Sequence, residues 1–383
     1  MVINNKHGIG SLQAETAQTL QALIETTIAP RDPDNPIYGA VLHVEGPCPN
    51  FSWSAAAGTT DHTDETQLTP QHPMRLASVS KTYVAAAILR LWEDKHIELN
   101  TAISEYLSSE HRQCLSVGGY QADHINVRHL LTHTSGLFDY ADSDTFAEET
   151  ASDFARRWCR TEQLQLAMDE GSPYGQPGEV YRYSDTGYIL LGEIIELITD
   201  QPLGAALRQL LNYSRLGLTS TWMESSEPAP EGVKLRAHQY LGKVDTNTLD
   251  PSFDIYGGGG LVSTVEEVAR FFRALFTGDV FVQPDTQNTL LSTANAQHGG
   301  PAAYGYYKQT PGVYRMGIEV EDIDGLSIYA HGGFWGTYAG YVPSLDVAIS
   351  FSLTQHNTKD EKKALFREVL KCVRNTLQAS STL

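Results

Sequence analysis

The clearest pattern of hydrophobic and polar positions lies near the C-terminal end of the chain. Between Val347 and Thr354, apolar residues alternate with serine and threonine, and this period of two predicts a half-buried strand. The turn sequences Asp322–Gly325 and Pro343–Asp346 suit hairpins, so neighbouring strands should pair antiparallel. Three further strands are expected, at Tyr314–Glu321, Leu326–His331 and Tyr338–Val342.

The N-terminal end combines a helical pattern with two more strands. Within residues 11–29, leucine and isoleucine recur at the spacing of one helical face, and the prolines that follow end this helix. Strands are expected at Tyr38–Val44 and Phe51–Ala57. The two ends of the chain are therefore predicted to contribute strands to a sheet.

Helices dominate the middle of the chain. The segment Val84–Trp92 is apolar nearly all round, which predicts a helix buried on every face. Thr264 and Glu267 form a capping-box signature before another helix. Further helical patterns cover Val127–Thr132, Thr145–Met168, Asp185–Thr199, Leu203–Leu211 and residues 360–377.

Strands at both ends and helices between them indicate an α+β protein. With 383 residues, the chain exceeds the usual limit of about 250–300 residues for one hydrophobic core. We therefore expect a sheet domain formed by residues 1–75 and 295–383, and a mostly helical domain formed by residues 76–294.

Charge and hydropathy narrow the possible partners and locations. Acidic residues outnumber basic ones, 46 against 27, and the net charge of −19 would repel nucleic acid. No stretch approaches the roughly 18 apolar residues of a membrane-spanning helix. The first ten residues lack the apolar segment of a secretory signal. We expect a cytoplasmic protein, or a periplasmic one if a leader has been removed.

The cysteines are few and far apart. No Cys-x-x-Cys pair occurs, so neither a disulfide scaffold nor a zinc ribbon is expected. Buried, reduced thiols are the default expectation for Cys48, Cys114, Cys159 and Cys372.

The segment Ser78-Val79-Ser80-Lys81 carries the first candidate chemistry. Residues three apart on a helix share a face, so Ser78 and Lys81 can meet. A neutral lysine amine can take the hydroxyl proton and make the serine a nucleophile. An S-x-x-K sequence is common by chance, but here a buried helix follows it.

Two other segments are compatible with the same chemistry. In Tyr181–Asp185 a tyrosine precedes a helix, and a phenol beside a lysine can relay a proton. In Ala330–Phe334, glycines on a strand let a substrate approach the backbone, and His331 could contact a substrate carbonyl or carboxylate. Taken alone, such a tyrosine more often caps a core helix, and a lone histidine more often has a structural role.

Competing interpretations are weaker. His129 and His133 are four residues apart and could bind a metal, but no glutamate follows His129, so a structural role is favoured. No G-x-S-x-G elbow is present, which disfavours an α/β-hydrolase. The run Gly257–Gly260 lacks dinucleotide-binding spacing and is interpreted as a tight turn.

Together, the three segments resemble the serine β-lactamase and penicillin-binding protein superfamily. The likeness is to its class C-like branch, with family VIII esterases and D-amino-acid peptidases and amidases. Ser78–Lys81 matches S-x-x-K, Tyr183-Ser184-Asp185 matches Tyr-x-Asn except at its last position, and His331-Gly332-Gly333 matches the H-x-G form of Lys-Thr-Gly. Residues 130–137 and 257–275 also resemble this branch.

The resemblance implies a β-lactamase-like fold, with an antiparallel sheet flanked by helices, a mostly helical domain, and the active site between them. Ser78 would be the acylated nucleophile, Lys81 its general base, and Tyr183 the acid/base that serves the leaving group. The backbone N–H groups of Ser78 and Phe334 would form the oxyanion hole. Asp185, His331, Gly333 and Phe334 would bind substrate, without metal or cofactor.

Two departures from the family pattern bear on the substrate. A carboxylate at Asp185 favours a protonated lysine and shifts the base assignment toward Tyr183. Ionised, it cannot donate a hydrogen bond to a substrate carbonyl. His331 weakens the fixed positive charge that would meet a β-lactam carboxylate. A small ester or a D-amino-acid amide or peptide is therefore favoured over a β-lactam.

The third motif also stands among aromatic residues. Phe334, Trp335, Tyr338 and Tyr341 follow it closely, and strand alternation assigns about half of them to an acyl pocket and the rest to the core. The leading interpretation is a serine hydrolase that forms an acyl-enzyme. The alternatives are a β-lactamase or D-Ala-D-Ala carboxypeptidase, and an inactive binding or scaffold protein with the same fold.

Overall fold

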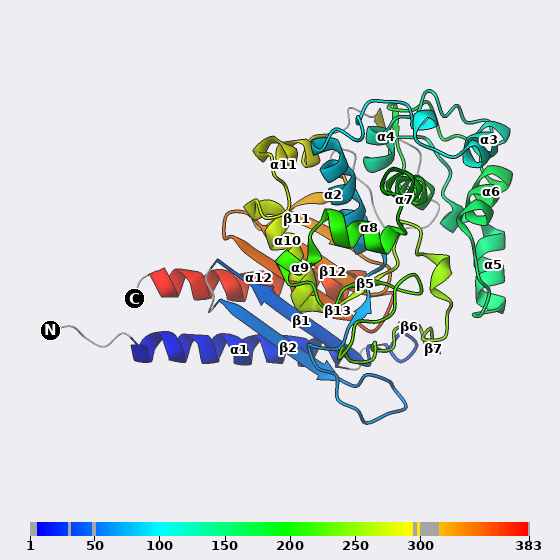
Figure 1. Ribbon diagram of the computed structural model, residues 1–383. Coiled ribbons are helices and arrows are strands. Elements are labelled where there is room, and N and C mark those ends of the chain that lie inside the picture. Colours follow the sequence, from blue (N-terminus) through cyan, green and yellow to red (C-terminus); the bar gives the residue numbers. More distant parts are fainter. Residues whose placement is uncertain (1–5, 30–31, 48–50, 294–296, 299–313, 382–383) are drawn as a thin grey trace.

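A computed structural model describes residues 6–29, 32–47, 51–293, 297–298 and 314–381 (Figure 1). Its main sheet has six antiparallel strands in the order β10-β11-β12-β13-β1-β2. The strands are β1 (Gly39–Glu45), β2 (Ser52–Gly58), β10 (Glu319–Ile323), β11 (Leu326–Gly332), β12 (Thr337–Val342) and β13 (Val347–Leu353). Both ends of the chain thus build one sheet, and the predicted α+β class is confirmed.

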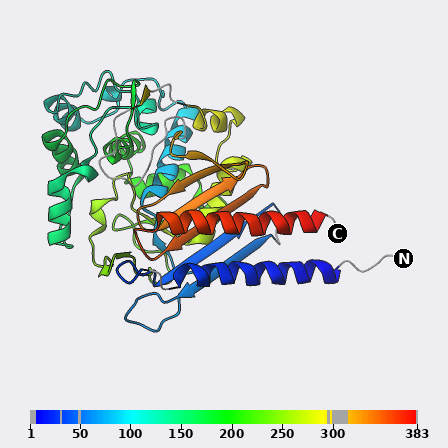
Figure 2. The same cartoon turned by 180° about the vertical axis from the view of Figure 1, so that it is seen from behind.

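Helices cover both faces of this sheet. The terminal helices α1 (Lys6–Ile28) and α12 (Lys359–Ser381) lie side by side on one face (Figure 2). On the other face, α10 (Val265–Thr277) packs against β1, β12 and β13. Buried side chains such as Ile24, Ile349 and Phe366 fill the layer between the sheet and the terminal helices.

The residues of α2 (Ser80–Glu93) from Ser80 to Leu89 are all buried. The segment Val84–Trp92, which is apolar nearly all round, is therefore part of a buried helix, as predicted. The helices that pack against α2 are α7 (Asp185–Thr199), α8 (Leu203–Leu210) and α11 (Pro284–Leu290). The bounds of the other helices in this part of the chain are α3 (Ser109–Val117), α4 (Val127–Leu131), α5 (Asp144–Ser152), α6 (Arg160–Glu170) and α9 (Tyr213–Leu216).

Short strands connect the sheet to the helices. A three-stranded antiparallel sheet has the order β3-β8-β5, and β6 pairs with β7 in a hairpin. The bounds are β3 (Met74–Arg75), β4 (Val180–Tyr181), β5 (Trp222–Met223), β6 (Tyr240–Leu241), β7 (Val244–Asp245), β8 (Leu261–Ser263) and β9 (Gln297–His298). Strand β3 leads directly into the turn that carries Ser78.

The strand predicted at Tyr314–Glu321 is misplaced. Tyr314 forms one isolated bridge, and the regular strand begins only at Glu319. Between them, Gly317 adopts φ +71° and its carbonyl accepts a hydrogen bond from Thr82 of α2 at 2.7 Å. The chain bends there because it packs against α2, a contact that strand periodicity does not encode.

Two helical predictions also need correction. The pattern at Thr145–Met168 is two helices, α5 and α6, because Asp153 adopts an extended conformation between them. Thr264 does cap α10, but the Glu267 carboxylate does not complete a capping box. It instead accepts hydrogen bonds from the backbone of Thr219 and Ser220.

The expectation that the cysteines are buried holds only in part. Cys114 is buried as expected, whereas Cys159 is exposed and Cys372 only partly buried, and Cys48 lies outside the described residues.

Among the described residues, no helix is both long enough and apolar enough to cross a membrane. The division into a sheet domain and a helical domain stays a prediction.

The sheet core gives a stability prediction. Ile349 is fully buried in β13, between β12 and β1, so Ile349→Ala should lower the free energy of unfolding by about 2–5 kcal/mol. Denaturant unfolding measures the change. Leu235→Ala is the control, because Leu235 is 91% exposed and its loss should change stability by less than about 0.5 kcal/mol. Equal effects would contradict the assigned core.

Candidate active site

Ser78 lies in a short 3-10 turn, Ala77–Val79, that continues directly into α2. Ala77 has φ +46°, a left-handed conformation that costs about 1–2 kcal/mol for a residue with a Cβ atom. Backbone strain of this kind often accompanies functional sites, where it fixes a side chain in place. Here it directs the partly exposed Ser78 into a cavity.

Lys81 follows one turn later, and its side chain is fully buried. The ammonium Nζ lies 3.1 Å from Ser78 Oγ, 2.6 Å from the Gly258 carbonyl oxygen and 2.6 Å from Asp185 Oδ1. Ser78 Oγ and the Gly258 carbonyl accept hydrogen bonds from Nζ, whereas Asp185 forms an ion pair with it. The predicted meeting of Ser78 and Lys81 is thus present, with Lys81 placed as a donor to the serine oxygen.

Tyr183 and Asp185 come from the segment that enters α7. The Tyr183 ring centroid lies 5.0 Å from Lys81 Nζ, and Tyr183 and Asp185 line the same cavity as Ser78. The tyrosine ring also packs against His133, with ring centroids 4.0 Å apart. His133 accepts a hydrogen bond from the Ser184 backbone N–H, and burial lowers the pKa of His133 well below its usual value. The imidazole is therefore neutral and holds Tyr183 in position.

Two backbone N–H groups border the serine. Within the described chain, neither the Ser78 amide nor the Phe334 amide donates a hydrogen bond to another protein group. The loop after β11 approaches the serine turn closely, since a Cβ atom on Gly333 would lie 2.3 Å from the Leu76 carbonyl oxygen. Thr337 Oγ1 donates to that same oxygen at 2.8 Å. Glycine is required at position 333 because only its backbone fits.

His331 lies behind the cavity wall. It is fully buried, its Nδ1 hydrogen-bonds the Gly332 carbonyl at 2.8 Å, and its Nε2 accepts from Tyr314 Oη at 3.1 Å. Burial lowers the pKa of His331 to about 3, so the ring is neutral. Neither His331 nor Gly333 lines the cavity, whereas Asp185 and Phe334 do.

The cavity itself has a volume of about 600 Å³ and is mostly apolar. Phe334 and Trp335 form one wall, whereas Tyr338 and Tyr341 pack inside the protein, so half of the predicted aromatic group lines the cavity. Sequence reasoning missed most of its lining, which includes Tyr140, Phe146, Phe154, Leu241, Leu249 and Phe253. These residues come from segments without a recognisable motif.

Acidic side chains outnumber basic ones in the lining of the cavity. Lys81 pairs with Asp185, and Arg182 pairs with Asp142 at 2.9 Å. Two further lining carboxyls, Asp139 and Asp254, have raised pKa values. Burial is the main cause at both, and the charge of Asp185 adds to it. The pKa of Asp254 rises to about 7.

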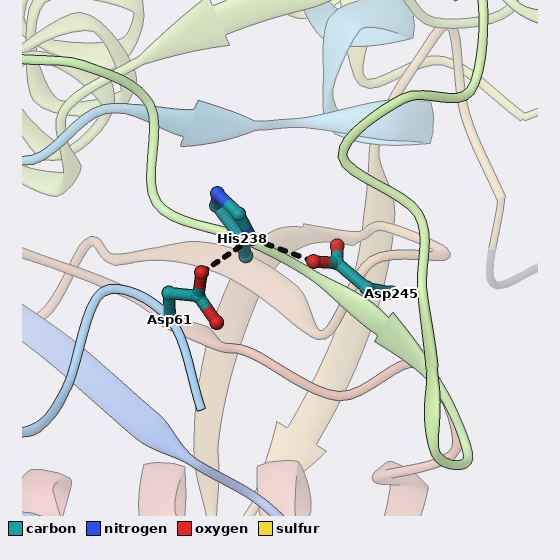
Figure 3. A group of neighbouring side chains, drawn as sticks. All are labelled: Asp61, His238 and Asp245. Carbon is teal, nitrogen blue, oxygen red and sulfur yellow. Dashed lines mark hydrogen bonds and ion pairs between the residues drawn. The ribbon is translucent and has the colours of Figure 1, made fainter. Parts of the chain in front are cut away.

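A separate cluster could hold a cation. Figure 3 shows His238 between Asp61 and Asp245, with Nδ1 2.7 Å from Asp245 and 3.6 Å from Asp61. The three ligand atoms lie within 4.8 Å of one another, but they already pair with each other and none lines the cavity. His129 belongs to the cap of α4, which agrees with the structural role favoured for it.

A serine hydrogen-bonded to a buried lysine one turn later, beside a tyrosine, defines the class of serine acyltransferases that use an S-x-x-K pair. The Beta-lactamase family matches residues 50–371, and the chain belongs to this family. The resemblance seen in the motifs and the predicted β-lactamase-like fold are thereby confirmed.

Among the individual relatives, some are named as penicillin-binding proteins and one as an esterase. Penicillin-binding protein 4 of Amycolatopsis lactamdurans is 26% identical over 334 residues, covering 82% of this chain and 81% of its own. Esterase EstB of Burkholderia gladioli is 27% identical over 309 residues, covering 73% and 75%. The chain spans only 58% of a Bacillus subtilis penicillin-binding protein, to which it is 26% identical over 281 residues.

The fold is shared with solved structures. D-amino acid amidase from Ochrobactrum anthropi SV3, complexed with L-phenylalanine amide, superposes with a TM-score of 0.76 and 20% identity. The superposition covers 94% of this chain and 99% of the amidase. Together, family and relatives agree with the prediction of a serine hydrolase.

The raised pKa of Asp254 gives a pH prediction. An unfolded aspartate loses its proton near pH 4, but folded Asp254 keeps it up to about pH 7. Its contribution to stability is therefore complete below pH 4 and declines as the pH rises to 7. Asp254→Asn should gain stability over the wild type at pH 8 but little at pH 4, as measured by denaturant unfolding. The exposed Asp200→Asn should parallel the wild type, and a pH-independent gain at position 254 would contradict the assignment.

Proposed function

We propose that this protein is a serine hydrolase that transfers the acyl group of an ester or amide to Ser78 and then to water. The hydrogen bond of 3.1 Å between Lys81 Nζ and Ser78 Oγ, at the wall of the cavity, carries this proposal. Tyr183, on the same cavity, is the third member of the catalytic group. The family match over residues 50–371, which includes Ser78, Lys81 and Tyr183, supports this assignment.

The reaction proceeds in two displacements. Ser78 Oγ attacks the substrate carbonyl carbon, its proton passes to the Lys81–Tyr183 pair, and the oxyanion accepts hydrogen bonds from the Ser78 and Phe334 amides. The bond to the leaving group then breaks as the pair returns the proton to the departing oxygen or nitrogen. Water repeats the sequence on the acyl-enzyme and releases the acid.

Asp185 determines which member of the pair accepts the proton. The carboxylate lies 2.6 Å from Lys81 Nζ and favours the charged ammonium in a buried site. With Lys81 as an ammonium, the group of this pair that can accept a proton is the phenolate of Tyr183. Tyr183 is therefore the base. Lys81 stabilises the phenolate and donates to Ser78 Oγ.

The cavity favours a substrate with a bulky apolar group and a free amine. Aromatic and aliphatic side chains form most of the lining, and Asp139, Asp142 and Asp254 add carboxyl groups. Such a pocket suits an amino-acid ester or amide with a large side chain. A β-lactam carboxylate would meet this acidic lining and, at position 331, a buried neutral histidine rather than a fixed cation. Penicillin hydrolysis and D-Ala-D-Ala carboxypeptidase activity are therefore second to esterase or amidase activity.

A catalytic prediction follows. With p-nitrophenyl butyrate, Ser78→Ala should lower kcat by at least about 1,000-fold, because no nucleophile remains. Tyr183→Phe should lower kcat by about 100- to 10,000-fold, since it removes the acid/base group. The exposed Ser116→Ala is the control and should retain full activity. Wild-type turnover equal to that of Ser78→Ala would support an inactive scaffold and contradict the proposal.

The acidic cavity gives a specificity prediction. Phenylalanine methyl ester should react with a kcat/KM about tenfold above that of its N-acetyl derivative, because Asp139 and Asp254 can ionise beside a free ammonium and pair with it. Both stereoisomers are measured, and the N-acetyl ester controls for the size of the side chain. Faster hydrolysis of the N-acetyl ester, or of a chromogenic cephalosporin, would contradict the assigned substrate class.

A further inference from the structure

The peptide bond between Gly333 and Phe334 is held from both of its sides. Its N–H, that of Phe334, is the second oxyanion donor in the proposed function. Its C=O, that of Gly333, accepts a hydrogen bond from Lys362 Nζ at 3.0 Å. One peptide unit therefore has a lysine on its carbonyl and carries the amide that the proposed function assigns to the oxyanion.

Lys362 reaches this carbonyl from the first turn of α12, a helix packed on the opposite side of the sheet from α10 (Figure 2). Its side chain is partly buried, and the bond to Gly333 is the one hydrogen bond that Nζ makes among the described residues. Glu319 of β10 attracts the ammonium and Lys359 repels it, while burial lowers the pKa of Lys362 to about 8. Lys362 forms no ion pair with another described residue, so its main partner is the peptide carbonyl.

The Phe334 side chain is fixed in the same region. Its ring packs on His356 with centroids 3.9 Å apart and on Trp335 with centroids 4.9 Å apart. The residue is thus held by its ring while Lys362 holds the peptide that precedes it. The orientation of the Phe334 N–H therefore depends on the contacts of the ring and on the hydrogen bond from Lys362.

We propose that Lys362 is a positioning residue that orients and polarises the Gly333–Phe334 peptide, so that the Phe334 N–H binds the oxyanion more strongly. The inference rests on the proposed function. An ammonium on the carbonyl oxygen draws electron density from the amide nitrogen, and hydrogen bonds in such chains strengthen one another. Lys362 acts through the peptide and does not touch the substrate.

A purely structural lysine would behave differently. A residue that only ties α12 to the sheet affects stability and substrate binding together. A residue that strengthens an oxyanion donor affects the transition state, where negative charge develops, and leaves ground-state binding nearly unchanged. The ratio of the effects on kcat and KM separates the two roles.

The test compares Lys362→Met with Lys363→Met, the neighbouring exposed lysine on the same helix. Loss of one oxyanion donor lowers kcat by about 100- to 1,000-fold, so weakening one is expected to lower kcat for p-nitrophenyl butyrate about tenfold. KM should stay within about twofold. Inhibition by phenylboronic acid, which forms a tetrahedral adduct on the serine, should weaken by the same factor as kcat. Lys362→Arg, which keeps the charge, should recover most of the loss.

Unchanged kcat in a folded Lys362→Met would overturn the inference, as would a rise in KM with boronic acid inhibition unaltered. If the methionine variant fails to fold, Lys362→Gln undergoes the same comparison against Lys363→Gln. A failure of the proposed function itself has a different signature, namely wild-type turnover that Ser78→Ala does not reduce. The two outcomes are therefore distinguishable.

Discussion

The site depends on one constraint, which is that the Lys81 amine must find polar partners in a place that water does not reach. An isolated buried ammonium costs several kcal/mol, even after the protein relaxes. Asp185 supplies the opposite charge, and the Gly258 carbonyl and Ser78 Oγ complete the hydrogen bonds. Each partner comes from a different segment, so satisfying this one group brings the start of α2, the start of α7 and the glycine run together.

Backbone packing makes this convergence possible. A Cβ atom on Gly257 would lie 2.2 Å from the Tyr188 carbonyl oxygen, and one on Gly192 would lie 2.0 Å from the Tyr256 carbonyl oxygen. Helix α7 and the glycine run therefore touch backbone to backbone, with Gly257 at φ +132°. This close approach brings Asp185 and the Gly258 carbonyl to the lysine. The same run that lacks dinucleotide-binding spacing thus has a structural role at the site.

Local geometry made part of this structure predictable. The i, i+3 spacing of Ser78 and Lys81, the alternation in β13 and the apolar surface of α2 each depend on one segment only. Contacts between distant segments could not be inferred in the same way. The bend at Gly317 arises from packing on α2, and His133 reaches Tyr183 through a left-handed backbone at φ +55°. His331 matched a motif position, yet only its burial against Tyr314 places it behind the cavity.

The central claim is that Ser78 carries the acyl group. Mass spectrometry of the protein after rapid acid quenching of a reaction with p-nitrophenyl butyrate tests it directly. The account predicts one butyryl adduct, located by peptide mapping on Ser78 and missing from Ser78→Ala. Turnover with no adduct on Ser78, or with an adduct on another residue that Ser78→Ala retains, would contradict it.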